Sequence, residues 1–215
     1  MAVKAILWDF GGVITTSPFD SFNRFEEQNN LPVNFIRGVN AINSEKNAWA
    51  LLESSQINDD EFDTLFLEES ILAGHGVRGA KILPLISQTQ IRPRMLEVLR
   101  ECRKHFMNVC LTNNARTGSG LAMSSDSEHE KAVSNATSLF DIVIESSKEG
   151  IRKPDPAIYR LACNRMGIEA ADIVYLDDLG INLKPARAMG ITTIKVLSEE
   201  QAITDLEKVT GLSFS

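Results

Sequence analysis

The chain has 215 residues, of which 43% are hydrophobic and 24% are charged, and its formal net charge at pH 7 is −7. This length favours one domain with an insertion, and the composition is typical of a globular protein. The acidic balance and the lack of a Lys/Arg run argue against nucleic acid or an anionic membrane as the main partner.

No apolar stretch approaches the roughly 20 residues that cross a bilayer, and Asp9 interrupts the short apolar run near the N-terminus. We therefore expect neither a secretory signal nor a membrane span. The three cysteines, Cys102, Cys110 and Cys163, are odd in number and widely spaced. This favours reduced thiols over disulfides or a metal site, and together these features predict a cytoplasmic protein.

The first predicted element lies within residues 3–14 (VKAILWDFGGVI). Its apolar run is typical of a strand buried on both faces, as in a parallel sheet. The run ends at Asp9, and the pair Gly11-Gly12 that follows allows a sharp turn and a close approach of another molecule to the backbone. Taken alone, Asp9 is either a turn or helix-capping residue, or an acid at the ligand-binding edge of an α/β sheet.

Residues 15–91 contain no strand pattern and predict helices over residues 18–28, 44–54, 59–73 and 79–87. Ser44 and Asp59 are the expected N-caps of the second and third helices. The third helix has one apolar face, formed by Phe62, Leu65, Phe66 and Leu72. We interpret this face as core, with a substrate groove as the alternative, and we expect the whole stretch to be an inserted helical subdomain.

From residue 91 helices and strands alternate. We predict strands at 106–111, 141–144, 173–176 and 192–196, and helices at 93–104, 128–137, 156–166, 182–189 and 199–209. The Gly/Ser-rich residues 115–127 are expected to form a mobile surface loop. This alternation predicts an α/β fold, a doubly wound parallel sheet with helices on both faces. Residues 1–14 and 92–215 would form this core domain, and residues 15–91 the inserted subdomain.

Polar residues follow three of the predicted strands: Asp9, the pair Thr112-Asn113 and the pair Asp177-Asp178, while Lys153 lies in the loop after a fourth strand. Parallel strands end at one edge of the sheet, so these residues should converge there. Carboxylate oxygens without nitrogen ligands suit Mg²⁺. A lysine, a hydroxyl, an amide and glycine N–H groups together suit phosphoryl oxygens, and a neighbouring carboxylate can attack phosphorus.

Each cluster also has a purely structural interpretation. Thr112 and Asn113 could cap a loop, and Lys153 could be a solvated loop lysine. Asp177 and Asp178 are harder to explain in this way, because two adjacent acids after an apolar strand repel each other unless a cation is present.

The motifs Asp9-Phe10-Gly11-Gly12-Val13, Leu111-Thr112-Asn113, Lys153-Pro154 and Leu176-Asp177-Asp178 resemble, in order and spacing, the four motifs of the haloacid dehalogenase-like superfamily. The segments 146–159 and 175–196 are most similar to the phosphatase-type domain of soluble epoxide hydrolases and to the amino-terminal domain of an acyl-CoA dehydrogenase family member. The resemblance covers essentially the whole chain and implies a Rossmann-like core with a helical cap.

The resemblance implies a Mg²⁺-dependent phosphatase that acts on a small phosphorylated metabolite. Asp9 would be the nucleophile and a metal ligand, and Lys153 would orient it and neutralise charge. Thr112, Asn113 and Lys153 would bind the phosphoryl group. Asp178 and the Gly11 carbonyl would complete the metal site, which Asp177 and Asn182 would support.

The sequence departs from the family at Gly11, where phosphatases of this family usually carry a second Asp that acts as general acid and base. Its loss removes a contribution of about 10²–10⁴ to the rate. Three hypotheses follow: a phosphatase that is slow or needs good leaving groups, such as acyl or sugar-1-phosphates; a phosphoryl-binding regulatory module without turnover; and a metal-free 2-haloacid dehalogenase. The paired acids Asp177 and Asp178 argue against the third. Sequence patterns define neither the physiological substrate nor the oligomeric state.

Overall fold

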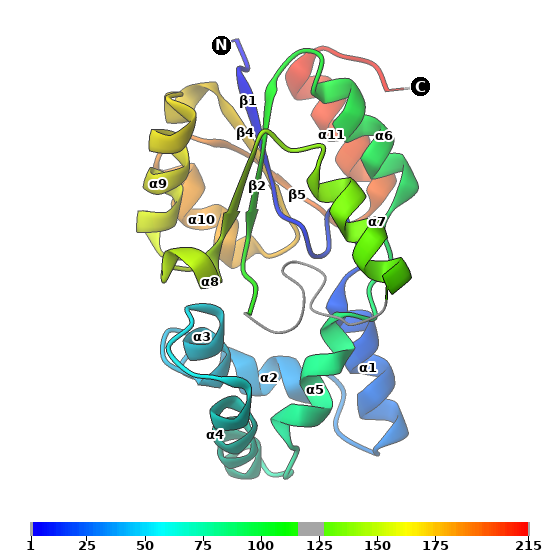
Figure 1. The fold of residues 1–215 in the computed structure, drawn as a ribbon, viewed down its shortest axis with the longest axis vertical. Coiled ribbons are helices and arrows are strands. Elements are labelled where there is room, and N and C mark those ends of the chain that lie inside the picture. The colour runs from blue at the N-terminus through cyan, green and yellow to red at the C-terminus, as the bar shows by residue number, and fades with distance from the viewer. Residues whose placement is uncertain (1, 116–126, 215) are drawn as a thin grey trace.

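The computed structural model describes residues 2–115 and 127–214, and its described part is built around a five-stranded parallel sheet with the strand order β3-β2-β1-β4-β5 (Figure 1). The strands are β1 (Ala5–Trp8), β2 (Met107–Thr112), β3 (Ile142–Glu145), β4 (Ile173–Asp177) and β5 (Thr192–Lys195). The predicted fold class is confirmed, because all four strand pairs are parallel and helices connect them.

Side chains of β1 point alternately to the two faces of the sheet, and each face has its own apolar core layer. Ile6 and Trp8 face one side and pack with α6 (Pro93–Cys102), α7 (Ser127–Thr137) and α11 (Glu199–Thr210). Ala5 and Leu7 face the other side and pack with α9 (Pro156–Met166) and α10 (Gly180–Ala188). Because both faces are covered, the strand is continuously apolar, which is the pattern that predicted it.

The five predicted helices of this α/β part begin and end within two residues of the prediction, and α9 matches it at both ends. Two short helices were not predicted. The first, α8 (Ser146–Glu149), lies in what the sequence indicated was a polar loop, and Gly150 ends it with a left-handed φ of 70°. The second is the 3₁₀ helix η2 (Ala170–Asp172), directly before β4. Most of the predicted mobile loop, residues 116–126, lies outside the described residues.

The helical segment between β1 and α6 contains α1 (Pro18–Gln28), α2 (Phe35–Ala41), α3 (Ala48–Glu53), α4 (Asp59–Leu72) and α5 (Gly79–Ile86), and has its own apolar cluster. Phe62 and Phe66 are fully buried in this cluster and Leu65 packs against it, so the predicted apolar face of α4 is core. Leu72 does not belong to that face, since its side chain is 88% exposed.

Two predicted N-caps in this segment were wrong, and one helix was not predicted at all. Helix α2 was missed because the N-terminal N–H groups of Asn34 and Ile36 are capped by the carboxylate of Glu26, a partner from another helix. The cap of α3 is Asn47 rather than Ser44, since its side chain accepts from Ala50 N. The cap of α4 is Asn58 rather than Asp59, and it forms a capping box with Glu61.

The two chain crossings between the helical segment and the sheet run side by side. Thr15 and Ile91 form an isolated antiparallel bridge, Arg92 N donates to Ile14 O at 2.9 Å, and Thr16 N donates to Gln90 O at 2.8 Å. In the ribbon of Figure 1 the helical segment lies at the end of the sheet where the strands terminate in polar residues.

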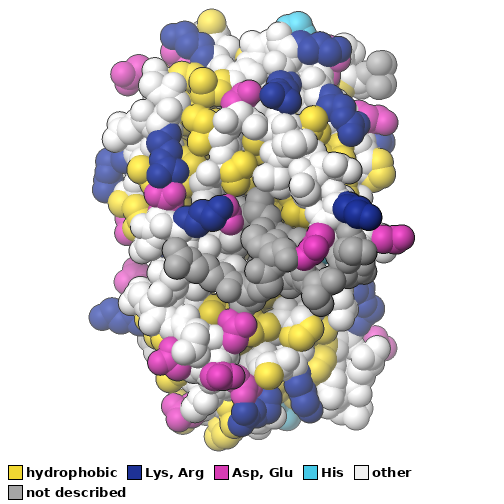
Figure 2. Space-filling view, viewed as in Figure 1, with side chains coloured by type: hydrophobic (Ala, Val, Ile, Leu, Met, Phe, Trp, Pro, Cys, Tyr) yellow, Lys and Arg dark blue, Asp and Glu magenta, His cyan; other side chains and the backbone are white. Residues whose placement is uncertain are grey.

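The remaining global features concern cysteines, charge and membrane spans. Cys102 and Cys110 are buried free thiols and Cys163 is a half-buried one, as predicted. On the face shown in Figure 2, basic and acidic side chains are interspersed. Within the described residues, no helix has the length and apolar character needed to cross a membrane.

Candidate active site

The candidate site lies where β1 ends, between β2 and β4. The chain adds β2 and β3 on one side of β1 and then β4 and β5 on the other side. This reversal next to β1 is the kind of switch point at which open α/β sheets bind ligands. Asp9 directly follows β1, Thr112 ends β2 and Asp177 ends β4. The parallel register therefore brings together the ends of three strands that are far apart in sequence (Figure 1).

Lys153 is the electrostatic centre of this site. Its side chain is 1% exposed, and Nζ lies 2.8 Å from Asp9 Oδ1 and 2.8 Å from Asp177 Oδ2. The interpretation of Lys153 as a solvated loop lysine is therefore wrong. Burial alone would lower the pKa of Lys153, but the two carboxylates outweigh it and raise that pKa, so the ammonium stays charged.

Asp177 is fully buried and its carboxylate is saturated with donors. Oδ1 accepts from Leu179 N at 2.7 Å, Asn182 Nδ2 lies 3.1 Å from both oxygens, and the Tyr175 hydroxyl donates to Oδ2, which also contacts Lys153. A carboxylate held in this way has little capacity left for a metal. It holds Lys153 in place, and Tyr175, whose role in the site no sequence motif indicated, belongs to the same network.

Asp9, Asp177 and Asp178 offer carboxylate oxygens that all lie within 4.8 Å of one another. Asp178 is the least buried of the three. Burial, reinforced by Asp177, raises the pKa of Asp178 to about 6. Burial also raises the pKa of Asp9, with Lys153 opposing and the two other acids adding to the effect. Three carboxylates against one ammonium leave a negative surplus, and hard oxygen donors with that surplus fit Mg²⁺.

Asp9 itself is oriented by two donors on one oxygen. Oδ1 accepts from Phe10 N at 2.7 Å and contacts Lys153 Nζ. Within the described residues, no hydrogen bond or ion pair reaches Oδ2, so this oxygen is available to a metal or to phosphorus. The interpretation of Asp9 as a helix cap is wrong, because β1 is followed by a turn and α1 begins only at Pro18.

The two glycines after Asp9 differ in their surroundings. Gly12 has a left-handed φ of 74°, and a Cβ built there would lie 2.3 Å from Asp178 Oδ2. The absence of a side chain at Gly12 therefore lets Asp178 approach the backbone. A Cβ at Gly11 would meet no atom within 4 Å, and its φ lies outside the left-handed region. The position of the missing second acid is thus sterically open.

The second motif is placed beside Lys153. Asn113 Nδ2 donates to Lys153 O at 3.0 Å and Asn113 Oδ1 accepts from Lys153 N at 2.9 Å. The side chain of Thr112 is buried and makes one long hydrogen bond, 3.4 Å, to the carbonyl of Asn113. The same Asn113 amide also donates to Glu53 Oε2 at 3.3 Å. Glu53 is a contact from the helical segment that no sequence signal indicated.

A small cavity of about 60 Å³ lies beside the turn and is lined by Gly11, Thr15, Thr112, Asn113 and His129 among others. Three residues that follow Gly11 within nine positions carry polar side chains that are candidates for the place of the second acid: Thr15, Thr16 and Asp20. Of these, only Thr15 lines the cavity, and its hydroxyl donates to Thr16 O at 2.9 Å.

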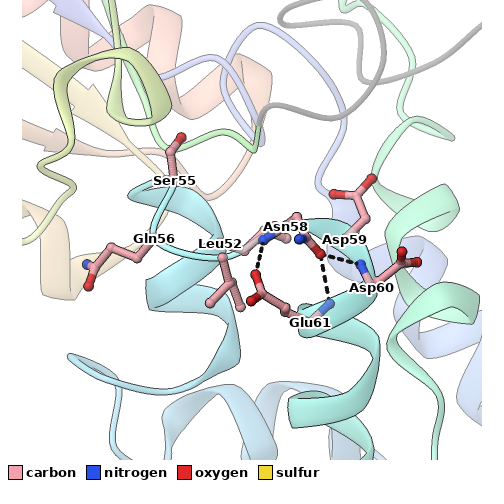
Figure 3. A pocket seen from close by; sticks show the side chains of 8 residues that line it. Leu52, Ser55, Gln56, Asn58, Asp59, Asp60 and Glu61 are labelled. Carbon is pink, nitrogen blue, oxygen red and sulfur yellow. Dashed lines mark hydrogen bonds between the residues drawn. The ribbon is translucent and has the colours of Figure 1, made fainter.

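A larger hollow, of about 570 Å³, lies on the turn between α3 and α4 and is lined by residues 52 and 55–61 (Figure 3). None of the candidate catalytic residues lines it. Its polar groups include the capping box, in which Asn58 and Glu61 bond to each other.

Residues 3–190 match the sequence model of the haloacid dehalogenase-like hydrolases. The chain is 32% identical, over 97% of its length, to acyl-CoA dehydrogenase family member 10 from Mus musculus, and 30% identical over its full length to bifunctional epoxide hydrolase 2 from the same species. It spans only 19% and 40% of the lengths of these two proteins. It is also 25% identical to the sesquiterpene phosphatase astK from Aspergillus oryzae, with 97% of each chain covered.

Among solved structures, a HAD family enzyme from Bacteroides thetaiotaomicron, in complex with magnesium and inorganic phosphate, superposes with a TM-score of 0.58. It is 21% identical, and the match covers 90% of this chain and 94% of that one, so the likeness concerns the fold. The predicted resemblance is confirmed by the family match and by both kinds of relative. The chain belongs to the haloacid dehalogenase-like hydrolases.

Proposed function

We propose that this hydrolase is a Mg²⁺-dependent phosphatase that acts on a small phosphorylated metabolite through an aspartyl-phosphate on Asp9. The observation that carries the proposal is the placement of one buried ammonium between Asp9 and Asp177, with Asp178 beside them. The phosphatase name of a relative that matches over nearly its whole length supports the same reaction class.

The charges favour a metal-dependent phosphoryl site over a dehalogenase site. Three carboxylates with one lysine repel an incoming phosphate dianion unless a cation is present. Asp9, Asp178 and the Gly11 carbonyl would hold Mg²⁺, and Asp177 and Asn182 would support the site from behind. When bound, the metal supplies charge neutralisation between the attacking carboxylate and the phosphoryl oxygens.

In the proposed reaction, Asp9 attacks phosphorus and the bond between phosphorus and the leaving-group oxygen breaks. Lys153 orients Asp9 and favours its ionised form against the effect of burial, and Thr112 and Asn113 bind the phosphoryl oxygens together with Lys153. Water then attacks the phosphorus of the acyl phosphate, which releases inorganic phosphate and regenerates the Asp9 carboxylate.

Gly11 limits both steps, because it cannot give a proton to the leaving group or take one from water. We therefore propose that turnover is slow with ordinary alkyl esters and faster with leaving groups that need little protonation, such as those of acyl and sugar-1-phosphates.

We further propose that residues 15–91 act as a cap on the core formed by residues 1–14 and 92–215. The bridge between Thr15 and Ile91 supports these boundaries, because it holds the two chain crossings together at one place. The separate apolar cluster of the helical segment supports its movement as a unit.

A phosphate-release screen with Mg²⁺, in which Asp9→Asn serves as the control, tests the proposal. Wild-type protein should release phosphate from at least one small monophosphate or acyl phosphate, and Asp9→Asn should not. Equal rates for the two proteins, or full activity in EDTA, would contradict the proposed function. Hydrolysis of 2-haloacids that continues in EDTA would instead indicate a dehalogenase.

A further inference from the structure

Glu53, the last residue of α3, brings a carboxylate from the helical segment into contact with the proposed phosphoryl site. Its Oε2 lies 3.3 Å from Asn113 Nδ2, and the same amide group donates to the carbonyl of Lys153 at 3.0 Å. One side chain therefore separates Glu53 from the lysine that contacts Asp9.

The position of Glu53 is defined by backbone and side-chain contacts on both sides. Ser146 Oγ donates to the Glu53 carbonyl at 2.7 Å, and Ser55 Oγ donates to the Ser147 carbonyl at the same distance. These two bonds fasten the end of α3 to the start of α8. The carboxylate therefore occupies its place as part of a docked helix end, rather than as a free surface side chain.

Arg152, which precedes the site lysine, offsets only part of the charge of Glu53, because it is shared with Ser44. Arg152 Nε lies 2.7 Å from Glu53 Oε2 without hydrogen-bond geometry, and Arg152 Nη1 donates to Ser44 O at 2.8 Å. The guanidinium is thus engaged by the helical segment, while the carboxylate contacts Asn113. Within the described residues no hydrogen bond reaches Glu53 Oε1, so this oxygen can accept one from a ligand.

The wall of the helical segment next to Glu53 has the same sign of charge. Leu52 and Ser55, which flank Glu53 and Ser54, line the hollow of about 570 Å³ shown in Figure 3. Its lining includes three acids, Asp59, Asp60 and Glu61, and no basic residue of the described chain. This charge has the same sign as that of Glu53.

We infer that Glu53 selects the substrate, favouring monophosphates whose leaving group is neutral and hydroxylated over those that carry a second anionic group. This inference rests on the proposed function. A hydroxyl of the leaving group can donate to Glu53 Oε1. A second carboxylate or phosphate near Asn113 is repelled instead, because like charges placed together disfavour binding.

The test compares two esters of similar size, glycerol 3-phosphate and 3-phosphoglycerate, which differ in a hydroxymethyl or a carboxylate group. Wild-type protein should favour the neutral ester by about tenfold or more in kcat/KM. Glu53→Gln keeps the shape and the acceptor oxygen and removes the charge, so the preference should shrink by about tenfold. Arg152→Gln leaves the Glu53 charge unbalanced, so the preference should grow.

The matched control is Glu149→Gln. Glu149 has the same side-chain exposure as Glu53, 18%, and also lies 2.7 Å from an arginine, Arg165, but within the described residues it makes no hydrogen bond or ion pair with the proposed site. The preference should not change in this variant. An equal preference in wild type and Glu53→Gln, or a wild-type preference for the anionic ester, overturns the inference.

A binding experiment can test the inference independently of the proposed function. It measures the dissociation constants of the two esters, with Mg²⁺ present, for the Asp9→Asn protein and for the double variant that also carries Glu53→Gln. A neutral preference that Glu53→Gln removes, without phosphate release by wild type, supports the inference and contradicts the phosphatase. Equal affinities, or no binding of either ester, contradict the inference.

Discussion

Gly11→Asp should raise the rate of phosphate release, because it restores a carboxyl group at the one motif position that departs from the family pattern. The structure accepts this side chain, since a Cβ at Gly11 meets no atom within 4 Å and its φ is not left-handed. Replacing a glycine under these conditions stabilises a fold by about 0.4–1 kcal/mol, which offsets repulsion from the neighbouring acids. The melting temperature should therefore change little.

The size of the effect follows from general acid–base catalysis, which contributes about 10²–10⁴ to a rate. A new carboxyl close to this cluster would have a raised pKa, because three carboxylates already lie together there with one ammonium, which pairs with two of them. A raised pKa suits a general acid at neutral pH. We expect a gain of about 10² in kcat, equivalent to about 2.7 kcal/mol of transition-state stabilisation.

The assay uses two esters that differ in their leaving group, glycerol 3-phosphate and 4-nitrophenyl phosphate. An alkoxide needs a proton as the bond breaks and a nitrophenolate does not, so the gain on Gly11→Asp should be concentrated on the glycerol ester. The double variant with Asp9→Asn should be inactive. A folded Gly11→Asp protein with no gain on either ester would refute the reasoning. An equal gain on both would show that the new carboxylate acts as the base that activates water, in the hydrolysis of the common acyl phosphate, rather than as the acid that protonates the leaving group.

Three further predictions concern the same cluster. Lys153→Met leaves two buried carboxylates without their ion pair and should cost about 3–5 kcal/mol of unfolding free energy, measured by urea denaturation. The control is Lys148→Met: the Lys148 side chain is 65% exposed, so its loss should cost less than about 1 kcal/mol. Similar losses in the two variants would contradict the central role of the buried ion pairs. Gly12→Ala and Gly150→Ala both place alanine at a left-handed φ. Gly150→Ala should cost about 1–2 kcal/mol of unfolding free energy from the backbone alone, and Gly12→Ala should cost more and abolish activity, because only its Cβ collides with Asp178. The pKa of Asp178 is raised to about 6 by burial and by Asp177, so its contribution to the stability of the metal-free protein is present at low pH and lost as pH rises through about 6. Asp178→Asn should flatten the fall of unfolding free energy over roughly pH 4–7, and an unchanged slope would contradict the assigned shift.

Most of the sheet could be predicted because its signal is local. The strand β1 is apolar throughout, since both faces are buried, and it ends at a polar residue followed by glycine. The start of α2 could not be predicted, because the residue that caps its N–H groups, Glu26, lies in another helix. The sequence pattern within α2 therefore does not indicate a capping residue that comes from α1.

The same distinction applies to the candidate site. The residues that end β1, β2 and β4 were predicted to converge, and the structure places Asp9, Lys153 and Asp177 in direct contact. Glu53 and Tyr175 could not be predicted, since their contribution depends on how α3 docks and on a hydroxyl that reaches Asp177. The roles of these residues, the domain boundaries and a cytoplasmic location remain predictions.

The most direct test of the account is a search for a covalent phosphoryl group on Asp9 during turnover. Protein that is acid-quenched with Mg²⁺ and an accepted substrate, then digested and analysed by mass spectrometry, should carry one phosphoryl group on the peptide that contains Asp9, and hydroxylamine should remove it. Asp9→Asn should carry none. Turnover without a phosphorylated Asp9 peptide, or with the phosphoryl group on another residue, would contradict the central claim that Asp9 is the nucleophile.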